Sequence, residues 1–170
     1  MNDNNGLPLV APRLTPVLDP CFRPAVLANR AFRALARASG NPVNVHLALE
    51  QADGSVFHYA TEILPTNHPH AAGNARYIER LVKFLLWAWG GWRIHVAGPH
   101  AIVDSLQRHF RDTATGRFDS DLIGVKVYER PIEVVHAKDI PPARASTAPL
   151  GRHLDGCRIG FDLGGSDRKV

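Results

Sequence analysis

The chain has 170 residues and a net charge of +4 with its histidines neutral, and 45% of its residues are hydrophobic. This length suits one domain of ordinary size, and this composition can form a packed core. The basic residues are mostly arginines spread along the chain, which favours a solvated surface over a nucleic-acid partner. The most apolar stretch, residues 81–92, is interrupted by Lys83 and a glycine pair and is too short to span a bilayer.

The cysteines and the N-terminus indicate the cellular compartment. Cys21 and Cys157 lie far apart in the sequence and lack metal-ligand spacing. Such sparse cysteines are typical of a reduced, cytoplasmic protein. Residues 1–5 are polar, with no charged segment followed by an apolar one, so the sequence predicts no signal peptide. We therefore expect a cytoplasmic protein with no membrane partner.

The first half of the chain predicts a lead-in, a helix and a hairpin. Residues 1–20 carry four prolines and little periodicity, which indicates an extended lead-in. Residues 23–39 place apolar side chains at helical spacing and are followed by Gly40 and Pro42, so we expect an amphipathic helix. An Asp-Gly turn separates residues 43–50 from residues 55–63 and predicts two antiparallel strands.

The second half predicts helices that alternate with strands. We expect Asn74 to cap an amphipathic helix over 75–89, which a glycine pair would end. The pattern then predicts a buried strand, a helix, a loop and a strand interrupted or ended near a proline, over 92–97, 100–111, 113–120 and 122–135. The prolines and small residues of 138–156 predict a linker.

This order of elements predicts an α/β domain of the α+β-like kind. The hairpin and a strand-helix-strand unit would form a mixed sheet, with helices packed on it. We expect this domain to cover residues 21–137. The lead-in of 1–20 would precede it, and the linker of 138–156 would connect it to a separate C-terminal segment, 157–170.

Histidines and tryptophans in the domain favour structural interpretations. The His-Pro-His sequence at 68–70 has no cysteine partner, so we expect exposed side chains rather than a metal site. His95 lies between two apolar strand residues and is expected to be half-buried and hydrogen-bonded. The three tryptophans of 87–92 are expected to pack at a helix end. Trp89 or Trp92 is the one that could be exposed, as a docking surface for a further domain or subunit.

The C-terminal segment carries the most specific pattern in the chain. A short apolar strand ends in Asp162, and the sequence continues as Leu-Gly-Gly-Ser-Asp-Arg-Lys. Paired glycines let backbone N–H groups point at an anion, and a serine hydroxyl adds a donor. An aspartate at the end of a strand can hold Mg²⁺ through water, and a lysine adds positive charge near phosphates. An ordinary Gly-Gly turn is the alternative interpretation.

Residues 159–166 resemble the first phosphate-binding loop of the sugar-kinase, actin and Hsp70 ATPase superfamily. Within it, the segment is most similar to the ROK family of bacterial sugar kinases and sugar-responsive repressors. The resemblance covers about fourteen of the 170 residues, 157–170. It implies that this segment is the first strand and loop of an actin-like ATPase domain whose catalytic body would lie beyond Val170.

The resemblance also implies cofactors and residue roles for the intact protein. ATP and Mg²⁺ would be the cofactors, with Asp162 positioning the metal. The β- and γ-phosphates would be bound by the loop residues Gly164, Gly165 and Ser166. Lys169, or Arg168 beside it, is the basic residue expected near the phosphates.

The function that the resemblance implies is ATP-dependent phosphorylation of a hexose by the intact protein. The leading domain would be an accessory module that contacts the downstream ATPase domain or another subunit. We expect the 170 residues alone to be inactive, because phosphoryl transfer needs several elements at once. A stand-alone protein-interaction module is one alternative. A sugar-responsive transcriptional regulator is another, although a winged helix needs more helices ahead of its wing than the one predicted here.

Overall fold

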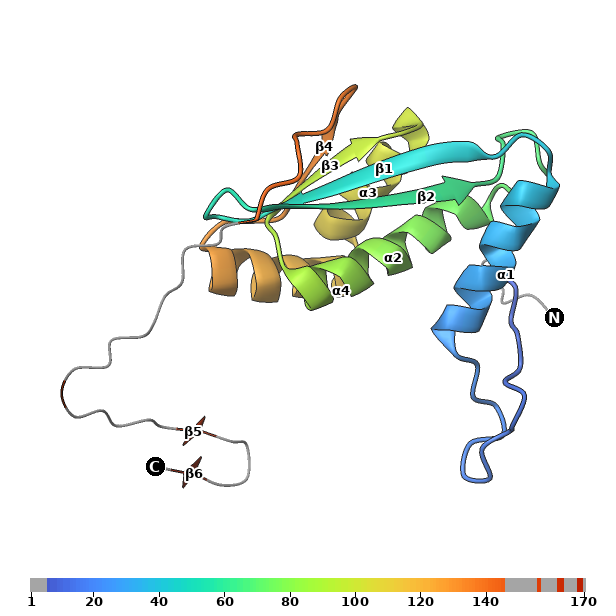
Figure 1. The fold of residues 1–170 in the computed structure, drawn as a ribbon, viewed down its shortest axis with the longest axis horizontal. Helices are drawn as coiled ribbons and strands as arrows, with labels where there is room; N and C mark the ends of the chain where they lie inside the picture. The colour runs from blue at the N-terminus through green and yellow to red at the C-terminus, as the bar shows by residue number, and fades with distance from the viewer. Residues whose placement is uncertain (1–5, 146–155, 157–161, 164–167, 170) are drawn as a thin grey trace.

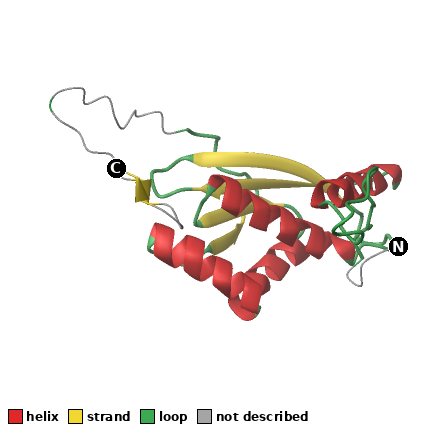
Figure 2. Ribbon diagram, turned by 90° about the horizontal axis from the view of Figure 1, so that it is seen from below, coloured by secondary structure: helices red, strands yellow, loops and turns green. Residues whose placement is uncertain are grey.

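The computed structural model describes residues 6–145, 156, 162–163 and 168–169. Within residues 6–145, a four-stranded mixed sheet carries helices on one face (Figures 1 and 2). The elements are α1 (Ala25–Ala38), β1 (Val43–Glu50), β2 (Val56–Ile63), α2 (Gly73–Trp89), β3 (Arg93–Ala97), α3 (His100–Asp112), α4 (Ala114–Asp119), the π-helix η1 (Ser120–Val127) and β4 (Glu133–His136). A separate two-stranded ladder joins β5 (Asp162–Leu163) to β6 (Arg168–Lys169). The predicted α+β class is confirmed.

The larger sheet has the strand order β2-β1-β3-β4. β1 pairs antiparallel with β2 and with β3, whereas β3 pairs parallel with β4. The predicted hairpin is confirmed, and Gly54 takes the left-handed backbone conformation that its turn requires, with φ of 79°. The register places Ala48 of β1 opposite His58 of β2 and His95 of β3. These three side chains therefore share the sheet face that carries no helices.

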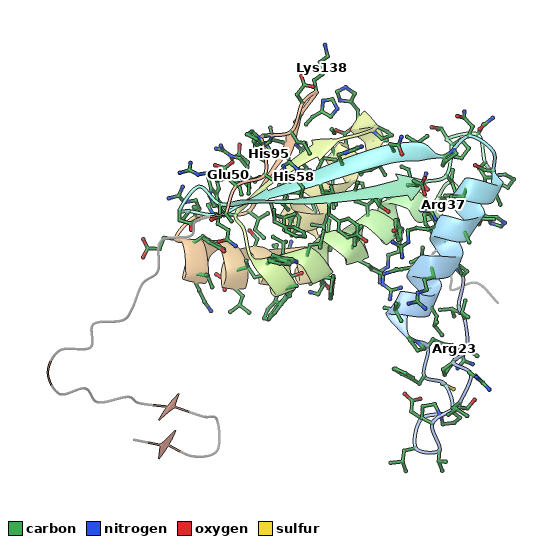
Figure 3. The ribbon with its side chains drawn as sticks, in the orientation of Figure 1. Arg23, Arg37, Glu50, His58, His95 and Lys138 are labelled. Atoms are coloured by element: carbon green, nitrogen blue, oxygen red, sulfur yellow. The ribbon has the colours of Figure 1, made fainter. Side chains whose placement is uncertain are left out.

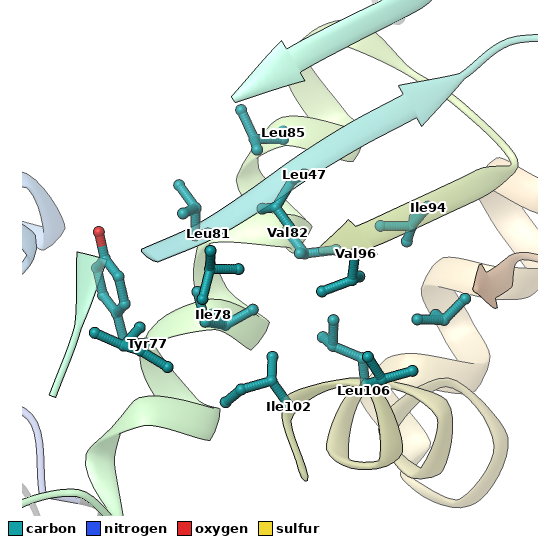
Figure 4. Close-up of a cluster of buried hydrophobic side chains, with 14 of the residues drawn as sticks. Leu47, Tyr77, Ile78, Leu81, Val82, Leu85, Ile94, Val96, Ile102 and Leu106 are labelled. Atoms are coloured by element: carbon teal, nitrogen blue, oxygen red, sulfur yellow. The ribbon is translucent and has the colours of Figure 1, made fainter. Parts of the chain in front are cut away.

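Strand alternation decides which face of the sheet is buried. On the helix-bearing face, Leu47 of β1 and Val96 of β3 are 0% exposed. Residues of α2 and α3 cover them, namely Ile78, Leu81, Val82, Leu85, Ile102 and Leu106 (Figure 4). Fully burying one such side chain contributes about 1.5–3 kcal/mol. The contact between the sheet and these two helices is therefore the core of the domain.

The predicted helix over 75–89 is confirmed as α2, but its predicted N-cap is wrong. The helix begins one residue before Asn74, whose side chain points into the protein. Asn74 Oδ1 accepts a hydrogen bond from Leu64 N at 3.0 Å, and Nδ2 donates to Leu64 O at 2.8 Å. These bonds satisfy the buried backbone just after β2 ends. Gly90, with φ of 77°, ends α2 as predicted.

The loop predicted over 113–120 and most of the strand predicted over 122–135 are wrong. These residues form α4, the π-helix η1 and only a short strand, β4. Glycines allow this close helical packing: a Cβ on Gly116 would lie 2.0 Å from the backbone oxygen of His109, and one on Gly124 would lie 2.7 Å from that of Arg130. The β-branched residues of this region favour strand, and tertiary packing overrides that preference.

Residues 137–145, which we call the crossing segment, run from β4 at one edge of the sheet to β2 at the other (Figure 1). Arg144 forms one antiparallel bridge with Val56 of β2, with N···O distances of 2.7 and 3.1 Å. His58 Nε2 donates to the backbone oxygen of Pro141 at 2.6 Å. Pro142 has no N–H to donate, so the pairing with β2 cannot continue along the strand. The crossing segment thus covers part of the sheet face that carries no helices.

Candidate functional site

The residues of the sequence-predicted phosphate loop lie partly within the described structure. Asp162 of β5 and Lys169 of β6 are directly opposite each other in the antiparallel ladder. The three residues predicted to bind phosphate, Gly164, Gly165 and Ser166, lie outside the described residues. The ladder pairs the residues that precede this turn with those that follow it. It therefore places the predicted acid and the predicted base on one rung.

The residue types on this rung suit a nucleotide bound with a metal ion. Mg²⁺ prefers carboxylate oxygens, water and phosphate oxygens, and a lysine can complement the charge of a phosphate. A turn that joins two paired strands can direct successive backbone N–H groups toward an anion. The ladder therefore fits the predicted role of the turn. It also fits an ordinary hairpin, which is the alternative interpretation.

The helix-free face of the larger sheet carries a row of charged residues (Figure 3). Glu50, Arg93 and Glu133 lie opposite one another on β1, β3 and β4. Arg93 Nε donates to Glu133 at 2.7 Å, and His95 Nε2 lies 2.8 Å from Glu50 Oε2. The prediction that His95 is half-buried and hydrogen-bonded is confirmed, since its side chain is 15% exposed.

This row ties three strands together. Glu50 is shared between His95 and the Arg93 guanidinium, whose Nη1 lies 3.8 Å away. An imidazole beside a carboxylate can act as a general base toward a bound substrate. Here, however, His95 Nε2 and Glu50 are bonded to each other across β1 and β3. The row therefore serves cross-strand pairing. Sequence reasoning missed it because the interacting partners lie 40 or more positions apart and meet only once the strand order is known.

A buried carboxylate joins α2 to α4. Asp119 is 0% exposed, and its two oxygens accept hydrogen bonds from Lys83 Nζ at 2.7 and 2.6 Å. Trp87 Nε1 donates to the same carboxylate at 3.1 Å. Lys83 and Trp87 lie one helical turn apart on α2, so both reach the end of α4. The sequence contains no motif that marks this pairing.

An open cavity of 540 Å³ lies at the edge of β2, beside the crossing segment. The stacked rings of Phe57 and Trp89, with centroids 4.4 Å apart, line it together with Arg144. Trp89 is 55% exposed, as the sequence allowed, but Trp87 is also 53% exposed, which was not expected. Trp92 is half-buried because two arginine guanidinium groups lie over its ring at 4.3 and 4.6 Å.

The histidines at 68–70 lie in the loop before α2. The expected exposure holds for His70, whereas His68 is half-buried; the His70 backbone N–H donates to His68 Nδ1 at 3.1 Å. Across the described ranges, no group of three His, Cys, Asp or Glu residues is placed to hold a metal ion. In the same ranges, no helix combines the length and the apolar character needed to cross a membrane.

Comparisons of the chain with protein-family models, with curated proteins and with solved structures found no match. The function is therefore inferred from the residues of the chain itself.

Proposed function

We propose that the turn between β5 and β6 is the first phosphate-binding loop of a cytoplasmic, ROK-type sugar kinase in the intact protein. The observation that supports it is the antiparallel ladder on both sides of the Gly-Gly-Ser sequence, with Asp162 and Lys169 on one rung. The domain of residues 6–145 is then an accessory module ahead of the ATPase domain. Phosphorylation of a hexose by ATP is the activity of the complete enzyme.

In this proposal each residue of the turn has one task. Asp162 positions a Mg²⁺ ion through its bound water, and Lys169 offsets the negative charge of the phosphates. The backbone N–H groups of Gly164 and Gly165 bind phosphate oxygens, and the Ser166 hydroxyl adds a further donor. The metal ion, when bound, stabilises the charge that develops during phosphoryl transfer. The 170 residues alone supply one loop and therefore no catalysis.

Isothermal titration calorimetry with ATP and Mg²⁺ tests this proposal. Two proteins are compared: residues 1–170 and a version continued into the downstream reading frame. We expect nucleotide binding by the longer protein only, and weaker binding after Asp162→Ala. Asp139→Ala, which removes an acid from the crossing segment, is the matched control and should leave binding unchanged. Unaltered binding by the Asp162→Ala variant would refute the role of the turn.

A protein-interaction module is the second candidate function. The observation that favours it is a group of exposed aromatic residues on α2 and α4: Phe84, Trp87 and Phe118 are 65%, 53% and 56% exposed. Aromatic side chains are enriched in the energetically dominant parts of protein interfaces. Sedimentation velocity of the chain and of its Phe84→Ser variant would detect self-association through this surface. Self-association that the Phe84→Ser variant loses would support this second candidate.

A further inference from the structure

The N-terminal residues 8–24, which we call the arm, are held to the domain at both ends. Before the arm, Leu7 is 1% exposed and belongs to the hydrophobic core. After it, α1 is fixed by Phe32, which is 0% exposed and stacks on Tyr77 with ring centroids 4.4 Å apart. Between these points the arm extends away from the sheet and its helices (Figure 1). The exposed arm is therefore a loop that is anchored to the domain at both ends.

The outermost part of the arm is aliphatic. Leu14, Val17 and Leu18 are 84%, 95% and 100% exposed, and we call these three residues the tip. Phe22 and Val26 extend the apolar surface toward α1, at 46% and 52% exposed. These exposed apolar side chains are close together in the sequence, unlike the single ones that are normal on a surface, and a group of this kind marks an interaction site.

The arm and α1 carry the excess positive charge of the described structure. Residues 6–42 contain five arginines and one acid, Asp19, whereas residues 43–145 contain eleven basic and eleven acidic residues. In residues 6–145, Arg13, Arg23 and Arg30 form no ion pair with an acid, unlike Arg37, which pairs with Glu62 on β2.

Arg23 is held at the base of the arm (Figure 3). Its Nη1 donates to the backbone oxygens of Pro20 and Phe22 at 3.2 and 2.8 Å. The guanidinium thus stays beside the backbone of residues 20–22, and Arg13 directly precedes Leu14 in the sequence. The arm and the first turns of α1 therefore combine aliphatic side chains with unpaired cations.

We propose that the arm and α1 dock onto an anionic lipid bilayer, with the tip entering the interface and the arginines contacting lipid headgroups. Insertion of aliphatic side chains and attraction of basic residues to anionic lipids are the two contributions that hold peripheral proteins on membranes. The tip has no aromatic ring, and Phe22 is the single aromatic residue of the arm, which disfavours a single-stranded nucleic acid whose successive bases would each need a ring for stacking. A second copy offers no acid excess over residues 43–145 to match the arginines.

This surface changes the expectation of no membrane partner. That expectation came from the lack of a spanning segment, and a peripheral contact does not need one. The proposed membrane contact is independent of the phosphate loop, so either proposal can fail without the other. Each arginine near an anionic surface strengthens binding roughly five-fold, so Arg13 and Arg30 together should contribute a factor of about 25 to the affinity.

Vesicle co-sedimentation of the complete 170-residue chain tests the proposal. The probes are vesicles of equimolar phosphatidylglycerol and phosphatidylcholine, and vesicles of phosphatidylcholine alone. We expect binding to the first, weakened by salt, and little binding to the second. The double variant Val17→Glu/Leu18→Glu should abolish binding, and Arg13→Gln/Arg30→Gln should weaken it about 25-fold.

Two matched variants separate this surface from general charge and hydrophobicity. Arg108→Gln/Lys126→Gln removes two exposed cations from α3 and η1, and Val127→Glu alters an exposed apolar residue of η1. Both should bind vesicles as the unaltered chain does, and thermal melts should show that all variants fold. The proposal is overturned if the chain ignores anionic vesicles, if the tip variant still binds, or if the control variants lose binding equally.

Discussion

The buried carboxylate between α2 and α4 leads to a quantitative prediction about stability. Lys83→Met removes the main partner of Asp119, which is 0% exposed in the folded protein. Breaking a buried ion pair from one side costs about 3–5 kcal/mol. We expect the low end, about 3 kcal/mol, because the Lys83 side chain is itself 37% exposed and water can partly replace it.

The reverse change should cost less. In Asp119→Asn, Lys83 and Trp87 can both turn to solvent, since their side chains already reach the surface. We expect a loss of about 1–2 kcal/mol from the weakened hydrogen bonds. The double variant Lys83→Met/Asp119→Asn leaves no buried charge and should be more stable than Lys83→Met alone.

Urea denaturation followed by circular dichroism measures these free energies of unfolding. A loss below about 1 kcal/mol for Lys83→Met would refute the reasoning, because it would mean that the carboxylate is solvated without its partner. A double variant no more stable than Lys83→Met would refute it as well.

Three further predictions follow from single contacts. Burial raises the pKa of Tyr77, which bonds to the Thr61 hydroxyl at 2.7 Å. As the pH rises, the unfolded chain therefore loses the Tyr77 proton before the folded chain does, and the free energy of unfolding should fall above about pH 10. This fall should be smaller in Tyr77→Phe, as measured by urea titrations at two pH values. Gly116→Ala should lose about 3 kcal/mol or more in the same assay, and its neighbour Thr115→Ala under about 0.5. His58→Ala should release the crossing segment and speed tryptic cleavage after residues 138 and 144 about five-fold, as seen by mass spectrometry.

Local patterns in the sequence predicted the elements whose stability is mainly local. The Asp-Gly turn, the apolar stripe of α2 and the glycine that ends it each depend on neighbours within a few residues. The alternation of β3 was enough to predict that His95 would be half-buried and hydrogen-bonded.

The features that sequence reasoning missed depend on contacts between distant parts of the chain. The helices of 114–127 form because Gly116 and Gly124 allow close approach to other backbone, and nothing in the local pattern shows those neighbours. The inward turn of Asn74 depends on the backbone that follows β2. The exposure of the arm could not be predicted either, because apolar residues in a lead-in are equally compatible with burial.

The direct test of the proposed phosphate loop is the nuclear magnetic resonance spectrum of its backbone amides in the protein continued beyond Val170. The amide signals of Gly164, Gly165 and Ser166 are followed while ATP and Mg²⁺ are added. We predict large, saturable shifts of all three signals, which Asp162→Ala diminishes. Shifts confined to other residues, or none at all, would contradict the account and leave the Gly-Gly-Ser sequence as an ordinary turn.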